Sequence, residues 1–394
     1  MLFHFDFRNW AKMVRLAAGE PDARTRRRYL LKLLVVVPLV ASFHALCFLL
    51  DGLLFPALWR TRIRTPVFVV GHARSGTTLL HRLMSRDRER FSSFLLYEMH
   101  FPSLLQKKLI RQAARLDRAL LGGALARRVE AWEERRYGAM RQVHPTGLTV
   151  PEEDDTVLYW SCASGFWITE MPYMGELDFY HVDRWPARRR RRLMRFYADC
   201  VRRQLLLNGA EKIHLSKNPT FAGRMESLIE TFPDARFVVP MRNPYETIPS
   251  LLKLVSGGWQ RRAWDRERVE RCLRILAEQS FDTYREPLRV LASHPEVPHA
   301  VVDYRELVAD PAATLEKVYA ELGFDLSPEL RESLRGAGRR ARGHVSAHRY
   351  SLEEFGLEAD AIRTALADLF AQYPWDGAEP LSAREGASGP REAG

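Results

Sequence analysis

Cysteine is rare in this sequence. The 394 residues include four cysteines, Cys47, Cys162, Cys200 and Cys272, and none lies within four residues of another. This spacing excludes the paired-cysteine motifs of zinc sites and of dithiol redox enzymes. We therefore expect buried, reduced thiols in a cytoplasmic protein, and no metal.

A cleavable secretory signal is also missing, because Met1–Trp10 has no basic start followed by an apolar stretch and a small-residue cleavage site. A long uncharged run follows instead. Leu33–Leu50 contains eighteen residues without a formal charge, which is just long enough to cross a bilayer. Arginines flank both of its ends, whereas a spanning helix usually has a one-sided excess of positive charge.

We expect residues 1–60 to form a basic, apolar, helical arm. Three interpretations of its segment 30–59 stay open at this point. The segment could span a membrane, lie in one leaflet as a peripheral or monotopic anchor, or be buried in the protein or in a homodimer interface.

Lysine is scarce relative to arginine, with 8 against 52, and the formal net charge is +11. The arginine excess has a simple explanation in genomic base composition. A basic surface also attracts an anionic substrate or an anionic membrane. No nucleic-acid-reading motif is present, so we expect no nucleic-acid partner.

Short apolar segments that read as buried strands alternate with helical patterns. The expected strands lie at 67–71, 212–215, 236–240 and 299–303, and the expected helices at 77–85, 103–141, after Pro151, and at 186–207, 219–230, 266–291 and 311–322. This alternation predicts a P-loop-like α/β fold of three layers, α/β/α, with a central parallel sheet. We assign residues 64–375 to this domain and 378–394 to a disordered tail. Ligands of such sheets bind beyond the carboxyl ends of the strands.

The first strand is followed by Gly71–Thr78, which reads GHARSGTT and opens a helix. Glycines let backbone N–H groups surround an anion, and the helix N-terminus adds partial positive charge. In a P-loop NTPase the lysine of GxxxxGK[ST] would stand where Thr77 stands. The loop therefore suits an oxyanion better than Mg²⁺-assisted ATP hydrolysis, with Arg74 supplying the positive charge.

Two further segments carry basic residues at strand ends. Arg236–Ser250 reads RFVVPMRNPYETIPS, with Arg242 where the strand ends and Ser250 eight residues later. A guanidinium fork suits a phosphate group, and a serine hydroxyl can add a hydrogen bond. Lys217 follows the strand before it.

These segments together resemble the sulfotransferases that use 3′-phosphoadenosine 5′-phosphosulfate (PAPS). The string ARSGTT resembles their 5′-phosphosulfate loop, with Ala73 in place of the usual proline, and Arg242 with Ser250 resembles their 3′-phosphate motif. Lys217 resembles the lysine beside the bridging oxygen of the donor. Its spacing to Arg242 is similar to that in a bacterial branch related to the tyrosylprotein and heparan-type enzymes. Arg342-Gly343 resembles the segment that closes over the 3′-phosphate.

The resemblance covers roughly residues 64–375 and implies sulfuryl transfer from PAPS, as co-substrate, to a hydroxyl acceptor without a metal. It implies catalytic roles for Lys217 and Arg74. It also implies that the donor is bound by Arg74, Ser75, Gly76, Thr77, Thr78, Arg242, Ser250, Arg342 and Gly343.

Sulfuryl transfer needs a base to accept the proton of the acceptor hydroxyl. Many family members have a histidine shortly after the lysine, but Pro219–Phe221 stand there in this chain, which favours a carboxylate. Glu98 is our first choice, because its position resembles that of the carboxylate base in the tyrosylprotein branch. The cluster Glu152–Asp155 is the second, and His72 could contact donor or acceptor. Weaker candidates are His144, His344 and His348, and Ser346 resembles a serine of the tyrosylprotein branch.

Two other functions stay open. The first is a P-loop nucleotide kinase or NTPase, which the missing loop lysine and the Arg242/Ser250 pair disfavour. The second is a non-enzymatic, membrane-associated scaffold with the same fold, which the intact Arg74, Lys217 and Arg242 disfavour. The acceptor is a small molecule or a lipid, and the apolar arm favours a lipid or another amphiphilic alcohol.

Overall fold

A computed structural model describes residues 1–141, 146–262, 264–341 and 352–375. The chain forms two compact units. Unit 1 consists of Met1–Val69, His81–Trp167 and Leu177–Arg236. Unit 2 consists of Val70–Leu80, Ile168–Glu176 and the chain from Phe237 onward.

The strands form a five-stranded parallel sheet in the order β2-β3-β1-β4-β5. The mainly apolar residues of β1 and β4 are almost completely buried, as expected for strands covered on both faces. The predicted α/β fold with a parallel sheet is confirmed. The strands are β1 (Val67–Val69), β2 (Phe91–Ser92), β3 (Ile213–Lys217), β4 (Arg236–Met241) and β5 (His299–Asp303).

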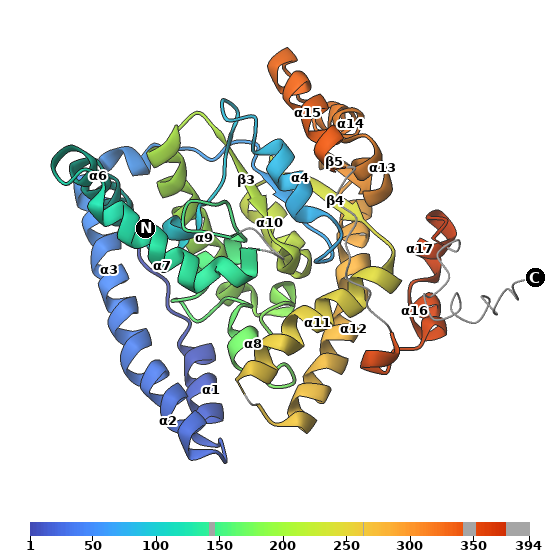
Figure 1. Ribbon diagram of the computed structural model, residues 1–394, viewed down its shortest axis with the longest axis horizontal. Helices are drawn as coiled ribbons and strands as arrows, with labels where there is room; N and C mark the ends of the chain where they lie inside the picture. Colours follow the sequence, from blue (N-terminus) through green and yellow to red (C-terminus); the bar gives the residue numbers. More distant parts are fainter. Residues whose placement is uncertain (142–145, 263, 342–351, 376–394) are drawn as a thin grey trace, which may run out of the picture. The chain divides into compact units, whose positions relative to one another are not determined.

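The helices of unit 1 include the N-terminal arm. The arm packs with the rest of this unit, and α3 contacts α6 (Figure 1). The helices of unit 1 are α1 (Phe7–Ala18), α2 (Ala23–Leu31), α3 (Val37–Leu54), α5 (Leu96–His100), α6 (Leu104–Leu120), α7 (Ala124–Arg141), α9 (Ala187–Asn208) and α10 (Met225–Thr231). Helices α4 (Thr77–Met84) and α8 (Trp167–Glu170) carry the chain from one unit into the other.

Unit 2 contains β4 and β5 together with the helices that follow them. Helix α11 packs along α12, and α14 along α15 (Figure 1). These helices are α11 (Pro244–Arg261), α12 (Arg266–Ser293), α13 (Tyr304–Ala309), α14 (Pro311–Glu321), α15 (Pro328–Ala341), α16 (Ala359–Ala365) and α17 (Ala367–Gln372).

Two predicted helices are wrong in part. The segment after Pro151 forms only a 3₁₀ turn, η3 (Asp154–Leu158), because the Asp155 carboxylate binds Ser164 Oγ and the backbone N–H of Gly165 instead of supporting a helix. The predicted helix 219–230 begins as a 3₁₀ turn, η5 (Pro219–Arg224), and becomes α-helical only in α10. Strand β2 and helix α5 are too short to give a periodic sequence signal.

Helix α2, a five-residue π-helical segment (Lys32–Val36) and α3 together form a continuous helix over Ala23–Leu54. It is long and apolar enough to cross a membrane by length and composition alone. The four cysteines are free and buried, which confirms the prediction of unbridged, buried thiols. The domain limits 64–375 stay a prediction, and the tail 378–394 lies outside the described residues.

Candidate active site

The phosphate loop begins where β1 ends, and two glycines give it its path. Gly71 has φ +131°, and a Cβ there would lie 3.2 Å from the Pro240 carbonyl oxygen of β4. Gly76 has φ +96°, and a Cβ would lie 2.6 Å from the Tyr304 ring. Only glycine fits both positions without strain. The loop then enters α4 at Thr77, so its backbone N–H groups open a helix as the sequence predicts.

Side chains within the loop stabilise its fold. Ser75 Oγ donates a hydrogen bond to the His72 carbonyl oxygen at 2.6 Å. The His72 ring is buried and stacks on Tyr284 of α12 with 4.9 Å between ring centroids. Burial lowers the pKa of His72 to about 4, so the ring is neutral near pH 7. His72 thus connects the loop to the core of unit 2.

Arg74, Arg242 and Ser250 lie together in unit 2. Arg74 Nε donates to Ser250 Oγ at 3.0 Å, and Arg242 Nη1 donates to the Arg74 carbonyl oxygen at 3.1 Å. The fold thereby brings the loop, the end of β4 and helix α11 into one cluster of two guanidinium groups and a hydroxyl. Such a cluster is suited to bind phosphate or sulfate oxygens.

Three residues that the sequence did not single out contact Arg242. Glu246, one helical turn later, accepts hydrogen bonds from the Arg242 guanidinium. The Tyr304 ring lies under the guanidinium carbon at 4.2 Å. Tyr284 OH donates to the Arg242 carbonyl oxygen at 2.7 Å. The i, i+4 spacing of Arg242 and Glu246 on a helix start could have indicated the first of these contacts.

Lys217 ends β3 in unit 1, and its Cα pairs in register with Val69 of β1. The Lys217 side chain is buried, and its Nζ donates to Glu153 Oε1 at 3.1 Å. The Glu153 side chain is 26% exposed, so this ion pair reaches the surface of unit 1 on the carboxylate side.

The two aspartates of the acidic cluster, Asp154 and Asp155, bind other buried side chains of unit 1. Asp154 Oδ2 accepts hydrogen bonds from Tyr197 OH at 2.6 Å and from His214 Nε2 at 2.9 Å, and all three side chains are buried. Asp155 pairs with the buried Arg224 at 3.1 Å. Burial raises the pKa of Asp155, while Arg224 opposes that shift. Within residues 153–155, the partner of Glu153 is the predicted catalytic lysine, whereas Asp154 and Asp155 stabilise the core of unit 1.

Glu98 lies in α5 of unit 1 and has no exposed surface. Its Oε1 pairs with Arg111 Nη2 at 3.1 Å, and its Oε2 accepts a hydrogen bond from the Leu95 N–H at 3.3 Å. The Arg111 side chain is 36% exposed and also donates to the Asn208 side chain. The carboxylate of Glu98 is therefore ion-paired on one oxygen and caps its own helix with the other.

Several predicted residues lie outside the part of the chain that the structure describes: Arg342, Gly343, His144, His344, Ser346 and His348. Over the described ranges, no group of three or more His, Cys, Asp and Glu side chains is arranged to hold a metal ion.

The family model of the Sulfotransferase family matches residues 66–328, which is more than half of the chain. The chain belongs to the sulfotransferase family. The matched residues include the loop, Lys217, Arg242 and Ser250, so the family predicted from the sequence is confirmed.

Relatives and solved structures agree with this family. The chain is 28% identical over 296 residues to omega-hydroxy-beta-dihydromenaquinone-9 sulfotransferase Stf3 of Mycobacterium bovis and of Mycobacterium tuberculosis. The match covers 68% of this chain and 66% of each relative. The fold is similar to that of sulfotransferase STF9 from Mycobacterium avium, with a TM-score of 0.71 at 18% identity, covering 94% of this chain and 93% of that one. It is also similar to STF1 from Mycobacterium tuberculosis H37Rv, with a TM-score of 0.60 at 21% identity and coverage of 93% and 94%.

Proposed function

We propose that this protein transfers the sulfuryl group of PAPS to a hydroxyl group of a lipid or another amphiphilic alcohol. The observation that carries the proposal is the cluster of Arg74, Arg242 and Ser250 around a glycine-bounded loop, in a chain that belongs to the sulfotransferase family. PAPS carries a phosphosulfate and a 3′-phosphate, and the cluster offers charge-assisted donors for such anions.

The proposed roles follow the chemistry of an in-line displacement at sulfur. The S–O bond to the acceptor forms as the bond to the 5′-phosphate breaks, and negative charge accumulates on the leaving phosphate. Lys217 and Arg74 would stabilise that charge, and the backbone N–H groups and hydroxyls of Ser75–Thr78 would hold the phosphosulfate. Arg242 and Ser250 would bind the 3′-phosphate, joined by Arg342 and Gly343.

Glu98 is the proposed base, with Glu153 as the alternative. The resemblance to the tyrosylprotein branch supports Glu98, and the contacts with Arg111 and the Leu95 N–H hold its carboxylate in one orientation. Two observations support Glu153 as the base: its carboxylate contacts Lys217 directly, and the Glu153 side chain is partly exposed. The proton leaves the acceptor hydroxyl for one of these carboxylates as the new S–O bond forms.

A lipid acceptor agrees with two observations. The two Stf3 relatives are named as sulfotransferases of a menaquinone-derived lipid. Helix α3 gives this chain an apolar N-terminal segment long enough to contact a membrane. We propose a cytoplasmic protein that meets its acceptor at the membrane surface.

The test is direct. Purified protein is incubated with PAPS and membrane lipid extracts, and mass spectrometry is used to search for lipids that gain one SO₃ group. Activity should persist in EDTA, because the proposed chemistry uses no metal. Adenosine 3′,5′-bisphosphate should bind in calorimetry. A protein that binds no bisphosphate and sulfates no extract would contradict the proposal, and activity that requires Mg²⁺ would favour a P-loop nucleotide enzyme.

A further inference from the structure

Large apolar side chains are exposed mainly on unit 1. Among the described residues, every strongly exposed large apolar side chain except Leu254 belongs to this unit. Most of them fall into two groups, one along α2 and α3 and the other along α6 and α7. Single exposed apolar residues are ordinary, but contiguous groups mark an interaction surface.

The first group is a stripe along α3. Leu39, Leu46 and Leu53 are 66%, 55% and 72% exposed, and their spacing of seven residues places them on one face of the helix. Only a third of the most apolar eighteen-residue window of this helix is buried inside the protein. The stripe is completed by Leu31, Leu34, Val35, Val36, Phe43, Leu49 and Leu54.

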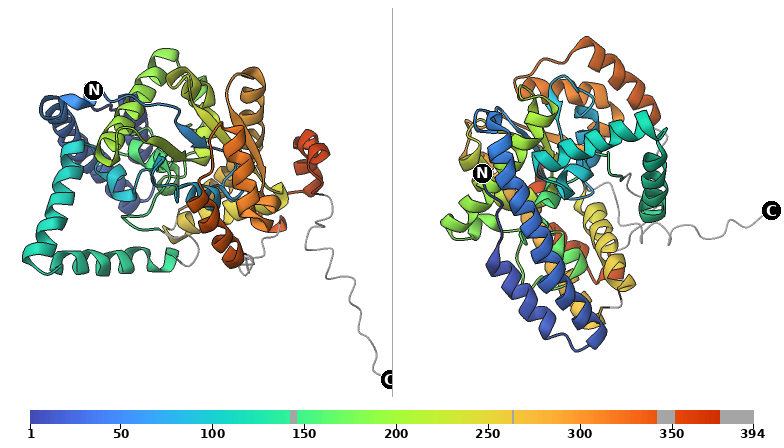
Figure 2. Two further views of the ribbon diagram at one scale, coloured as in Figure 1. Left: turned by 90° about the horizontal axis from the view of Figure 1, so that it is seen from above. Right: turned by 90° about the vertical axis from the view of Figure 1, so that its left-hand side faces the viewer.

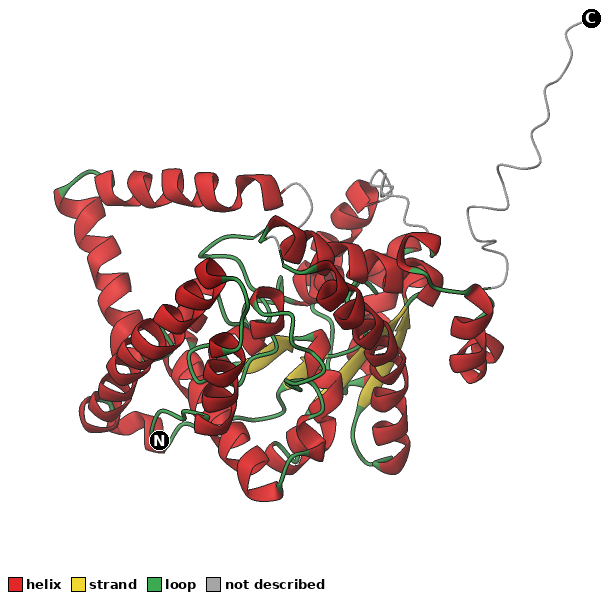
Figure 3. Ribbon diagram, turned by 90° about the horizontal axis from the view of Figure 1, so that it is seen from below, coloured by secondary structure: helices red, strands yellow, loops and turns green. Residues whose placement is uncertain are grey.

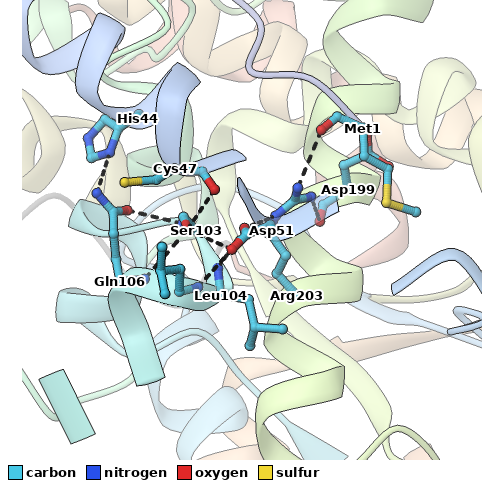
Figure 4. A network of polar contacts seen from close by, with 10 residues as sticks. Met1, His44, Cys47, Asp51, Ser103, Leu104, Gln106, Asp199 and Arg203 are labelled. Carbon is cyan, nitrogen blue, oxygen red and sulfur yellow. Dashed lines mark hydrogen bonds and ion pairs between the residues drawn. The ribbon is translucent and has the colours of Figure 1, made fainter. Parts of the chain in front are cut away.

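The opposite face of α3 is attached to unit 1 by buried polar contacts (Figure 4). Asp51 Oδ2 pairs with Arg203 Nε of α9 at 2.7 Å, and neither side chain is exposed. The same carboxylate accepts hydrogen bonds from two backbone N–H groups at the start of α6, each at 2.8 Å. His44 Nδ1 lies 3.1 Å from Gln106 Nε2. A helix that crossed a bilayer would have to withdraw Asp51 from Arg203, which would leave two unpaired charges in apolar surroundings.

The second group lies where α6 meets α7. Asp117 accepts hydrogen bonds from the backbone N–H groups of Leu125 and Ala126, both at 2.9 Å, and so fixes the corner between the helices. Leu120 and Leu121 at this corner are 75% and 62% exposed. Figures 2 and 3 show the corner at the edge of unit 1, and the right-hand view of Figure 2 shows α3 and α6 on the same side of the unit. The group continues through Leu109, Leu116, Leu125, Val129 and Trp132.

Exposed basic residues border both groups. Asp51 is the one carboxylate in residues 23–64, and its charge is paired with Arg203. The exposed basic residues beside the α3 stripe are Arg24, Arg27, Arg28, Arg60, Arg62 and Arg64, and those on α6 include Lys108, Arg115 and Arg118. This surface of unit 1 is therefore apolar and carries more positive than negative charge, since Arg127, Arg128, Arg135 and Arg136 of α7 outnumber Glu130, Glu133 and Glu134.

An anionic lipid surface matches this combination better than a second copy of the chain does. Apolar side chains bordered by arginines are typical of helices that lie in the headgroup layer of a membrane. In a symmetric dimer built on this face, the arginines of the two copies would be brought together, and like charges oppose such an interface.

We propose that the α3 stripe and the α6–α7 corner form one docking surface, by which unit 1 lies monotopically on an anionic membrane. Helix α3 stays attached to the protein through Asp51 and Arg203 while its apolar face enters the headgroup layer. This inference rests on the proposed function: a docked enzyme can receive a lipid alcohol that never leaves the bilayer.

The first experiment is flotation of the full-length protein with vesicles, without donor or acceptor. The protein should float with vesicles that contain equal parts of phosphatidylcholine and phosphatidylglycerol, and less with phosphatidylcholine alone. The triple variants L39S/L46S/L53S and L116S/L120S/L121S should each reduce the bound fraction by about fivefold or more, because each removes apolar contacts with the lipid. The control L254S removes a leucine of unit 2 that is 53% exposed, and it should float like the unsubstituted protein.

Circular dichroism and bisphosphate binding establish that each variant is folded. A folded protein that does not float with anionic vesicles, or triple variants that float normally, would overturn the docking surface. Light scattering provides the other decisive result: a stable dimer that both triple variants dissociate would make a second copy the occupant. Because lipid binding is measured without PAPS, its failure is distinct from a failure to bind bisphosphate or to sulfate a lipid.

The second experiment separates a monotopic helix from a spanning one. L2C and S293C each place an accessible thiol in a protein whose own cysteines are buried. A monotopic helix leaves both new thiols on the cytoplasmic side, so an impermeant maleimide should label both only after spheroplasts are lysed. Labelling of L2C in intact spheroplasts, with S293C still protected, would show a spanning helix and overturn the proposal.

Discussion

Arg74 Nε donates a hydrogen bond to Ser250 Oγ at 3.0 Å, although the two residues are 176 positions apart in the sequence. Arg242 joins them through the Arg74 carbonyl oxygen. The contact joins the phosphate loop to helix α11 within unit 2. Single substitutions in this cluster can therefore test the proposal that it binds the donor.

Replacing Arg242 with Ala should weaken the binding of adenosine 3′,5′-bisphosphate by about 10- to 150-fold, or about 1.5–3 kcal/mol, because charge-assisted hydrogen bonds are lost. Arg242→Lys keeps the charge without the guanidinium fork and should give an intermediate affinity. Isothermal titration calorimetry measures both. Unchanged affinity in Arg242→Ala would remove the 3′-phosphate assignment.

Glu246 should compete with the donor, because it occupies the guanidinium fork of Arg242. Glu246→Gln should tighten bisphosphate binding by up to about fivefold, since a half-exposed ion pair contributes little and its loss frees the fork. Glu270→Gln breaks the i, i+4 pair with Arg266 on another part of unit 2 and should leave the affinity unchanged. Weaker binding in Glu246→Gln would mean that Glu246 positions Arg242 for the phosphate.

Glu98→Gln should lower turnover by about 10²- to 10⁴-fold, the usual contribution of a positioned base, with little change in bisphosphate affinity. Arg111→Gln breaks the same ion pair but keeps the carboxylate, so it should retain most of the turnover.

A different pattern of activities would contradict the role of Glu98 as the base. If Glu98→Gln and Arg111→Gln lose the same small part of the activity while Glu153→Gln abolishes it, the base is the carboxylate beside Lys217. Glu152→Gln is measured beside these variants, because the sequence predicts that the base could be any carboxylate of the cluster Glu152–Asp155.

Acid should destabilise the protein through His72 and His81, because burial lowers the pKa of each from 6.5 to about 4. The folded state resists protonation of these rings, so their contribution to stability is complete above about pH 6.5 and is lost as the pH falls toward 4. His81→Gln should reduce this loss by about 1.4 kcal/mol per pH unit within that window. Urea unfolding at a series of pH values measures the slope. An unchanged slope in His81→Gln would mean that this histidine is protonated in the folded protein.

Asp51→Ala should destabilise unit 1 by about 3–5 kcal/mol, because it leaves the buried Arg203 without its counter-charge. The surface variant Glu270→Gln should unfold like the unsubstituted protein, since the Arg266 side chain is 93% exposed. Chemical denaturation provides the comparison. Equal stability of the two variants would show that α3 is not held to unit 1 by this pair. Because α3 also contributes buried apolar side chains, substitution tests the arm more cleanly than removal of residues 1–60.

The sequence by itself indicated the family, the alternating α/β order and the two phosphate motifs. These features are local: a buried strand, a glycine turn and a helix start follow each other along the chain, so Gly71–Thr78 and Arg236–Ser250 can be read directly. It could not separate the members of the acidic cluster, because Glu153, Asp154 and Asp155 are chemically alike and adjacent.

Only the tertiary structure decided which partner each carboxylate has. Asp154 meets Tyr197 and His214, whereas Glu153 meets Lys217, because β3 and α9 bring these distant residues beside the η3 turn. The same holds for α3, whose composition alone permits a spanning helix. Its buried pair between Asp51 and Arg203 forms across 152 positions, and such pairing depends on how helices pack and on no local pattern in the sequence.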